Sequence, residues 1–236
     1  TQLMRELRQI VAEAGDASSP APTSPPAGTN SGGSGNTPVG SRAPLPERER
    51  WEAHLRGHGP FDPTTLRIRA VQRLESLGAE VLVAAADVCN VEQMRAAIVA
   101  ATDRFGPING VVHAAGVVKD GPLLTKTSSA VEDVFTPKIH GTQVLHELFP
   151  DGALDWLALF SSTSTVTAPA GQVDYVAANE YLNAYANSRR GGLTRVVAID
   201  WGIWNEVGMA AAALAERTGD RPPAPVEPAH APLLDQ

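Results

Sequence analysis

The sequence predicts a doubly wound α/β domain built on a parallel sheet. Four apolar runs of strand length alternate with segments whose apolar residues recur every three to four positions, as in helices with one buried face. Alternation of this kind is typical of a parallel sheet covered by helices on both faces. Hydrophobic residues make up 43% of the 236 residues, which is enough for one buried core.

The composition also limits the classes of function. There are 19 Lys and Arg against 26 Asp and Glu, so the net charge is −7, and a nucleic-acid partner, which needs a basic surface, is not expected. No apolar run approaches the roughly 20 residues of a membrane-spanning helix, and no secretory signal opens the sequence, so we expect a cytoplasmic protein without membrane contact. Cys89 is the single cysteine, and His54 and His58 lack a third ligand, so we expect no metal ion.

Four regions of different composition follow one another along the sequence. Residues 1–14 carry apolar side chains at helical spacing, which predicts an amphipathic helix. Residues 15–46 are rich in Pro, Ser, Gly and Thr and are predicted to form a flexible linker. Residues 47–215 read as the globular domain, and the Pro-rich residues 216–236 as a linker to another domain.

The elements of the domain follow from local signals. Asp62 can cap a helix that begins at Pro63, and Gly78 ends that helix. The elements expected after it are a strand at 80–86, a helix at 91–105, a strand at 108–113, a helical region at 128–149, a strand at 154–160, a helix at 173–189 and a strand at 194–200. Pro137 lacks a backbone N–H and should divide the helical region into a short helix and a longer one.

The binding site is expected beyond the carboxyl ends of the strands, where ligands bind in open parallel sheets. Small or polar groups follow each predicted strand: Asp87-Val88, His113 to Gly116, Ser161 to Ser164, and Trp201 to Trp204. Tyr175 and Asn179 are four residues apart and share one face of the following helix. They could meet Ser162 and Lys138 at this edge of the sheet.

These four residue types have a joint chemical use. A tyrosine, with an ordinary pKa near 10, is a poor acid at neutral pH, but a nearby ammonium favours its ionised form. Such a tyrosine can give a proton to an alkoxide that develops on a carbonyl oxygen held by a serine. A hydride donor beside that carbonyl would complete a reduction.

Several motifs in order resemble the ketoreductase domain of modular type I polyketide synthases. They are Asp87-Val88, HAAG at 113–116, PKIHGT at 137–142, FSS at 160–162, YVAAN at 175–179 and WGIWNEVGMA at 201–210. That family belongs to the short-chain dehydrogenase/reductase superfamily, so the resemblance implies its Rossmann-like fold. In the wider superfamily the lysine follows the tyrosine by four. Here Asn179 holds that place and the lysine is Lys138, which is the polyketide-type arrangement.

The resemblance implies a reaction and a role for each matching residue. NADPH would reduce a β-ketoacyl chain on an acyl carrier protein, beside neighbouring polyketide synthase domains of the kind used in antibiotic biosynthesis. The implied catalytic residues are Tyr175 as proton donor, Ser162 on the keto oxygen, Lys138 as the cation beside the tyrosine and Asn179 as orienting residue. The implied cofactor contacts are Asp87 and Val88 at the adenine, Ala114, Ala115 and Gly116 along the cofactor, Arg42 near the 2′-phosphate, and Lys138 and Tyr175 in the reacting part. Trp201 to Met209 would cover nicotinamide and substrate.

Product stereochemistry is a finer implication. Family members that give one alcohol configuration carry Leu-Asp-Asp after the HAAG-type motif, and this chain has Val118-Lys119-Asp120 there. Members of the opposite hand often carry Trp eight residues before the tyrosine, where this chain has Thr167. Asp120 without that Trp favours the D-configured, B-type product.

The Gly-rich first βα unit of the family is not found, so the fold is expected to be truncated there. The nearest candidate, residues 31–36, has no strand before it and no helix after it. Three explanations stay open: a deleted or incompletely represented ketoreductase, a cofactor-free remnant, or a unit supplied by another segment. The alternative function is therefore a non-catalytic scaffold within a megasynthase.

Overall fold

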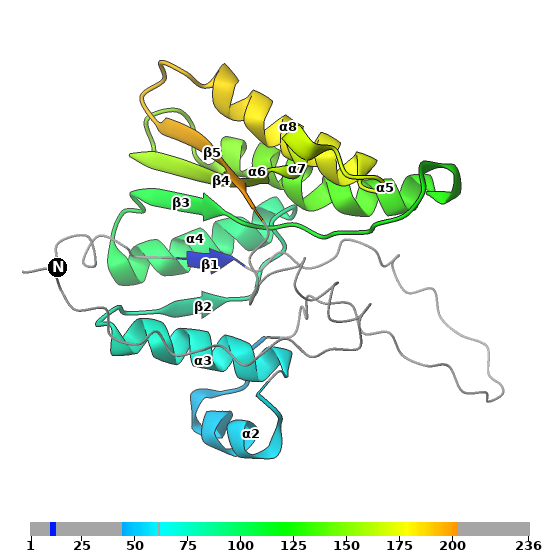
Figure 1. Ribbon diagram of the computed structural model, residues 1–236. Coiled ribbons are helices and arrows are strands. Elements are labelled where there is room, and N and C mark those ends of the chain that lie inside the picture. Colours follow the sequence, from blue (N-terminus) through cyan, green and yellow to red (C-terminus); the bar gives the residue numbers. More distant parts are fainter. Residues whose placement is uncertain (1–9, 13–43, 61, 203–236) are drawn as a thin grey trace, which may run out of the picture. The chain divides into compact units, whose positions relative to one another are not determined.

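The structure is a computed structural model that describes residues 10–12, 44–60 and 62–202. Helices and strands alternate along the chain (Figure 1). The strands are β1 (Ile10–Ala12), β2 (Leu82–Ala84), β3 (Gly110–His113), β4 (Trp156–Ser162) and β5 (Arg195–Trp201). The helical elements are η1 (Arg48–Arg50), α2 (Trp51–Gly57), α3 (Pro63–Ser76), α4 (Val91–Phe105), η2 (Leu123–Thr125), α5 (Ser128–Phe135), η3 (Thr136–His140), α6 (Gly141–Leu148), α7 (Ser164–Thr167) and α8 (Val173–Ser188).

The described strands pair in parallel, which confirms the predicted sheet type. Strands β3, β4 and β5 lie side by side in that order, with Gly110 opposite Trp156 and Trp156 opposite Arg195 (Figure 1). Strands β1 and β2 form a separate parallel pair. Parallel neighbours need long crossover connections: helices α5 and α6 lie between β3 and β4, and helix α8 lies between β4 and β5.

Strand β1 corrects the sequence-based expectation for the first residues. A helix was expected over residues 1–14, but Ile10–Ala12 is a strand whose residues pair with Leu82 to Ala84. Ile and Val are β-branched and favour strands, and the edge of β2 supplies backbone partners that the sequence alone does not show. The remainder of residues 1–14 lies outside the described residues.

Helices α3 and α4 begin and end at local signals. Asp62 accepts a hydrogen bond from the Thr65 backbone N–H at 2.8 Å, and Pro63 follows it, so the expected start of α3 is confirmed. Asn90 caps α4 in the same way through the N–H of Gln93, at 3.0 Å. The helix ends at Phe105, as expected, because Gly106 adopts a φ of 82° that disfavours other residues.

The helical region around Pro137 is divided by a π-helical turn, η3. Helices α5 and α6 on either side have eight residues each, so the expectation of a short and then a longer helix is wrong in its lengths. A π turn inserts an extra residue into the hydrogen-bond ladder, which accommodates a residue without a backbone N–H. The position of η3 in the fold matters for the site because this turn contains Lys138.

The described core has three apolar clusters. One joins β4 to α8 through Leu157, Leu159 and Leu182, and another joins the end of β2 to α4 and α6. The third holds Trp51, Ile68 and Val71, with Leu45 packed against it. The Nε1–H of Trp51 also donates to the carbonyl of Pro46 at 2.8 Å, so the packed part of the chain begins before residue 47.

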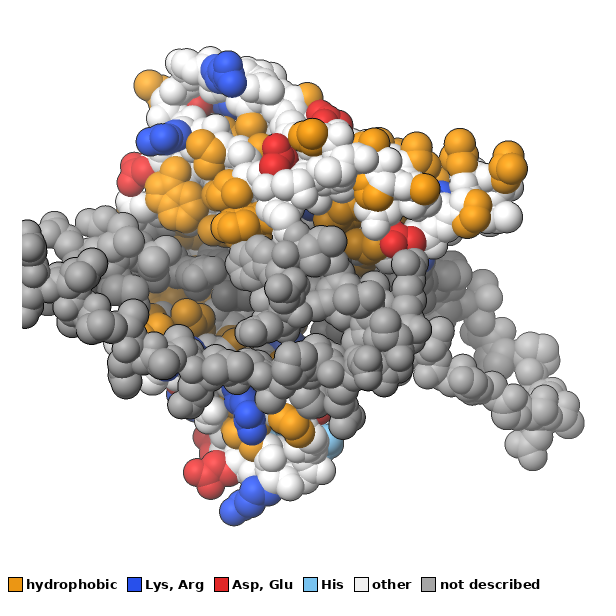
Figure 2. All heavy atoms as spheres, in the orientation of Figure 1, with side chains coloured by type: hydrophobic (Ala, Val, Ile, Leu, Met, Phe, Trp, Pro, Cys, Tyr) orange, Lys and Arg blue, Asp and Glu red, His pale blue; other side chains and the backbone are white. Residues whose placement is uncertain are grey.

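Some large apolar side chains reach the surface, where Figure 2 shows hydrophobic groups in orange. Leu123 and Leu124 of η2 are 67% and 98% exposed, so the segment after β3 has an apolar tip. Within the described ranges, no helix combines the length and the apolar character needed to cross a membrane. Residues 203–236 lie outside those ranges, so the end of the domain and the linker at 216–236 stay predictions.

Candidate active site

The expected catalytic residues lie on three elements, β4, η3 and α8. Ser162 is the last residue of β4, Lys138 lies in η3, and Tyr175 and Asn179 lie in the first turns of α8. Helix α8 contacts both β4 and η3, which places these segments next to one another. The side chains come from parts of the chain far apart in sequence, as the expected site requires.

Lys138 is held beside the ring of Tyr175. Its Nζ atom donates to the carbonyl of Phe160 at 2.8 Å and lies 5.9 Å from the centroid of the Tyr175 ring. The residue is 3% exposed, and burial lowers the pKa of its ammonium to about 8. At neutral pH the group is therefore still mainly charged, so a cation stands next to the phenol.

A glycine makes room for this lysine. A Cβ atom on Gly116 would lie 3.0 Å from Cε and 3.5 Å from Nζ of Lys138. Contacts as short as 3.0 Å force the neighbour to move. The HAAG motif thus ends in glycine where the backbone passes close to the lysine side chain, a role that the sequence alone did not suggest.

Asn179 is anchored to the backbone of α8 and keeps one unused polar atom. Its Nδ2 donates to the carbonyl of Tyr175 at 2.7 Å, and Ser161 Oγ donates to the Asn179 carbonyl at 3.3 Å. The residue is fully buried, and its Oδ1 has no hydrogen-bond partner within the described part of the chain. Buried polar atoms usually have a partner, so this oxygen is suited to accept a hydrogen bond from a water or a ligand.

Ser162 presents a hydroxyl whose proton remains available. Its Oγ accepts a hydrogen bond from the backbone N–H of Ser164 at 3.1 Å, and Thr165 Oγ1 donates to its carbonyl at 2.9 Å. A hydroxyl that accepts from a backbone N–H still has its own O–H to donate. Ser162 is therefore suited to donate to a carbonyl oxygen.

The residues expected at the adenine lie just after β2. One Asp87 oxygen accepts the N–H of Cys89 at 2.9 Å, and the Asp87 N–H donates to Gln93 at 2.8 Å. Val88 is 2% exposed, and its Cγ1 would lie 2.9 Å from a Cβ on Gly141. The Val88 side chain thus belongs to the core, which leaves its backbone as the part that could contact a ligand.

The structure describes only some of the other residues expected to contact the cofactor or to cover the nicotinamide and substrate. Ala115 packs against the cluster between β2, α4 and α6, and Ala114 is exposed at the end of β3. Trp201 ends β5 with its ring 5.3 Å from that of Phe160, whose carbonyl accepts from Lys138. Arg42 and Met209 lie outside the described residues, and so does the Gly-rich candidate at 31–36.

His113 is a buried neighbour of the site. It is 3% exposed, and burial, followed by the charge of Lys138, lowers its pKa to about 4. The imidazole is therefore neutral near pH 7 and packs near Gly141. This burial agrees with a structural role for His113 at the end of β3.

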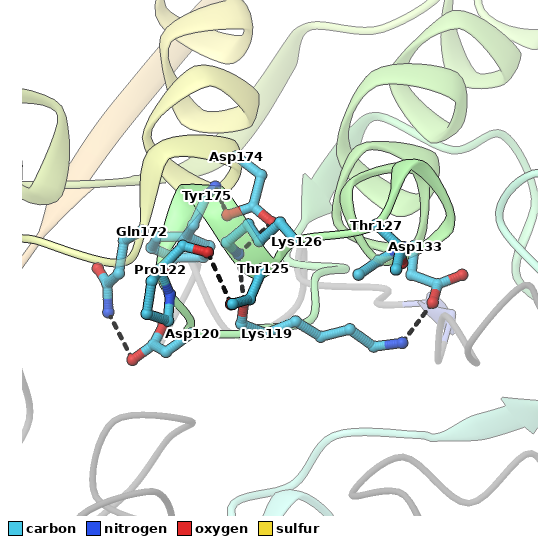
Figure 3. A network of polar contacts seen from close by, with 11 residues as sticks. Lys119, Asp120, Pro122, Thr125, Lys126, Thr127, Asp133, Gln172, Asp174 and Tyr175 are labelled. Carbon is cyan, nitrogen blue, oxygen red and sulfur yellow. Dashed lines mark hydrogen bonds and ion pairs between the residues drawn. The ribbon is translucent and has the colours of Figure 1, made fainter.

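A second polar network lies near the start of α8, where Tyr175 is found (Figure 3). Asp120 accepts a hydrogen bond from Gln172 Nε2 at 3.1 Å, and Lys126 Nζ lies 2.6 Å from Asp174 Oδ2. Lys119 forms an ion pair with Asp133 of α5. Of these residues, the sequence analysis assigned a role only to Asp120, because it lies in a family motif.

The described residues fit a nicotinamide dinucleotide at its two ends. Asp87 uses one oxygen for Cys89, so the other can accept from an adenine amino group. For the other end, Lys138 carries N–H donors and Ser162 an O–H donor, and Asn179 Oδ1 is an acceptor that has no partner in the described ranges. In the described ranges, no group of three or more His, Cys, Asp or Glu could hold a metal ion.

Comparison of the sequence with known proteins finds one family model and similar synthases. Residues 53–206 match the family model described as KR domain. The chain is 40% identical over 172 residues to a phenolphthiocerol/phthiocerol polyketide synthase of Mycobacterium tuberculosis H37Rv. It is 38% identical over 172 residues to the 6-methylsalicylic acid synthase of Aspergillus terreus. Each match covers 72% of this chain, which spans 9% of the length of either relative.

Solved structures show the same relationship. An A1-type ketoreductase is 36% identical with a TM-score of 0.58, and the match covers 68% of this chain and 33% of that one. The ketoreductase from the first module of phoslactomycin biosynthesis in Streptomyces sp. HK803 is 34% identical with a TM-score of 0.56, covering 64% and 34%. A short-chain dehydrogenase/reductase of Burkholderia phymatum in complex with NAD, 21% identical with a TM-score of 0.51, covers 58% and 52% and shares the fold.

Proposed function

Because the chain belongs to the KR domain family, the ketoreductases of polyketide synthases within the short-chain dehydrogenase/reductase superfamily, we propose that it reduces a β-keto group to a hydroxyl. Its relatives of this family are oxidoreductases. The observation that carries the proposal is the approach of Lys138 Nζ to 5.9 Å from the Tyr175 ring centroid, with Asn179 bonded to the Tyr175 carbonyl.

Each side chain of the site has one task in the proposed reaction. Ser162 donates its O–H to the keto oxygen, which polarises the carbonyl. Tyr175 gives a proton to the same oxygen as negative charge develops there. The Lys138 ammonium stabilises the charge left on the phenol, and Asn179 Oδ1 holds a water that can return a proton. NADPH, when bound, supplies the hydride that reaches the carbonyl carbon.

The proposed substrate is a β-ketoacyl chain carried by an acyl carrier protein, and the proposed partners are neighbouring polyketide synthase domains. Support comes from the curated relatives, which are polyketide synthases of which this chain spans 9%. A carrier that presents a thioester would bring the keto group to the carboxyl ends of β4 and β5. We place this reaction in the cytoplasm, as expected from the sequence.

For the product we propose the B-type configuration. Support comes from Asp120, whose carboxylate accepts from Gln172 close to the first turn of α8, and from Thr167 in the place of the tryptophan of the opposite hand. A-type ketoreductases are among the similar structures, at 36% identity, so the configuration needs a direct test. Chiral chromatography of the product decides: a D-configured alcohol supports the proposal and an L-configured alcohol contradicts it.

The experiment that tests the proposed function uses this chain with NADPH and a β-ketothioester of N-acetylcysteamine. NADPH oxidation together with formation of the β-hydroxythioester is the expected result. Binding is measured separately by the fluorescence of NADPH, with NADH as the matched control. A chain that binds neither nucleotide and forms no alcohol would contradict ketoreduction and would support the scaffold alternative.

A further inference from the structure

A buried ion pair adjoins Tyr175 and has no part in the proposed reaction. Lys126 Nζ lies 2.6 Å from Asp174 Oδ2, and the two side chains are 4% and 1% exposed. Burying two charges is costly unless both are paired and hydrogen-bonded. Surface ion pairs are common and weak, so a pair this deep next to the expected proton donor calls for a specific explanation.

The other hydrogen bonds of Lys126 and Asp174 connect the loop after β3 to the start of α8 (Figure 3). Lys126 Nζ also donates to the carbonyl of Lys119 at 2.5 Å. The second oxygen of Asp174 accepts the backbone N–H of Tyr175 at 2.9 Å. A continuous chain of polar contacts therefore runs from the loop after β3 to the backbone of Tyr175.

The start of α8 depends on these contacts because it lacks a side-chain cap. Gln172 precedes the helix but makes no capping hydrogen bond to it. The first N–H groups of a helix have no partner within the helix, and Asp174 satisfies the one that belongs to Tyr175. Lys126 fixes the carboxylate that does so.

Other contacts hold the same loop beside α8. The Gly121 N–H donates to the Gly171 carbonyl at 3.0 Å, and Gln172 donates to Asp120 at 3.1 Å. The hydrogen bond between Gln172 and Asp120 is solvent-exposed, whereas the ion pair of Lys126 and Asp174 is shielded from solvent. Electrostatic attraction is stronger away from water, so the buried pair is the firmest link between loop and helix.

We propose that Lys126 and Asp174 are positioning residues that hold Tyr175 in place for proton transfer. The inference rests on the proposed role of Tyr175 as proton donor. Neither residue touches the reacting atoms: Lys126 acts through Asp174, and Asp174 acts through the backbone of Tyr175. Displacement of a reacting group by about 1 Å can cost about a hundredfold in rate, so loss of the link should reduce turnover.

The test variant is Lys126→Met with Asp174→Asn. It removes both charges together, which avoids a buried unpaired charge and keeps the net charge unchanged, and the Asn oxygen can still accept from the Tyr175 N–H. Ile68→Ala, in α3 and fully buried in another cluster, is the control for a loss of stability alone. We expect kcat to fall about tenfold or more in the double variant and less than about twofold in the control, with the Kd for NADPH unchanged. A double variant that loses no more kcat than Ile68→Ala would overturn the proposal.

A second measurement observes Tyr175 without turnover. The chain has three tyrosines, so fluorotyrosine labelling gives three fluorine NMR signals, and Tyr175→Phe assigns one of them. In the double variant we expect the Tyr175 signal to shift or broaden while those of Tyr181 and Tyr185 stay in place. An unchanged Tyr175 signal, or equal shifts of all three, would overturn the positioning role.

The two readouts separate this proposal from the proposed function. If the unaltered chain reduces no ketothioester but the Tyr175 signal responds as expected, the function fails and the positioning role stands. If the double variant does not fold, Lys126→Gln with Asp174→Asn takes its place, because it also leaves no buried unpaired charge, keeps the acceptor for the Tyr175 N–H and removes the ion pair. The same shift of Tyr175 is expected there, and its absence overturns the proposal.

Discussion

The ammonium nitrogen of Lys138 lies 5.9 Å from the centroid of the Tyr175 ring while it donates a hydrogen bond to the carbonyl of Phe160 at 2.8 Å. The bond to the Phe160 carbonyl fixes the cation near the end of β4, and the ring belongs to the first turn of α8. Burial lowers the pKa of Lys138 to about 8. The charge beside the phenol is therefore present at neutral pH and is lost in mildly alkaline solution.

Ketoreduction should depend on pH through this lysine. As pH rises through about 8, Lys138 loses its proton, so the rate of alcohol formation should fall. Lys138→Met should lose activity about a hundredfold and should lack this alkaline decline. The measurement is the initial rate of β-ketothioester reduction from pH 6 to 10, and an identical decline in Lys138→Met would contradict the assignment.

Stability should change over an adjacent pH range for the same reason. The pKa of Lys138 is 10.5 when unperturbed and about 8 in the fold, so between these values the unfolded chain binds more protons than the folded one. The cost of burying the charge is present below pH 8 and disappears as pH rises toward 10.5. Relative to Lys138→Met, the free energy of unfolding should rise by on the order of 3 kcal/mol across this range. Urea unfolding at both ends measures it, and parallel curves for the two proteins would refute it.

Gly116→Ala should reduce activity by moving Lys138. The added methyl would lie 3.0 Å from Lys138 Cε, whereas nothing lies within 4 Å of a Cβ on Gly121, which makes Gly121→Ala a matched control. Since the lysine side chain can shift, we expect a stability loss of only about 1 kcal/mol but a roughly tenfold lower kcat. Thermal unfolding and steady-state rates of both variants are the measurement. Equal rates in the two would count against the close packing of Gly116 and Lys138.

Acid should destabilise the fold through His113. Its pKa is 6.5 when unperturbed and about 4 in the fold, chiefly because of burial, so folding favours the neutral ring. This contribution is complete above pH 6.5 and is lost as pH falls toward 4, by about 3 kcal/mol. His113→Gln should show a shallower decline in Tm between pH 7 and pH 4. The same slope in both proteins would mean that His113 does not titrate as its burial requires.

Local signals made much of the fold predictable. The bounds of α4 agree with the expected 91–105 because Asn90 caps the start and Gly106 takes a positive φ at the end. Strand lengths are less certain from sequence: β2 is Leu82–Ala84 within an apolar run at 80–86. Pairing partners decide where a strand stops, and Ile10–Ala12 became a strand for the same reason.

Only those site residues that lie in the recognised motifs could be predicted from the sequence. The sequence drew attention to Lys138, Ser162, Tyr175 and Asn179, and the structure brings Lys138 and Asn179 to Tyr175. Lys126 gave no signal, because its partner Asp174 is 48 positions away and an isolated lysine reads as a surface charge. Contacts between distant segments depend on tertiary packing, which periodicity and spacing do not encode.

The most direct test of the central claim compares Tyr175→Phe with Tyr181→Phe on the same helix. Each change removes one phenol oxygen, but only Tyr175 is assigned as proton donor beside Lys138. NADPH-dependent reduction of the β-ketothioester should fall by about a hundredfold to ten-thousandfold in Tyr175→Phe and should stay within about twofold in Tyr181→Phe. Undiminished reduction by Tyr175→Phe would contradict the account.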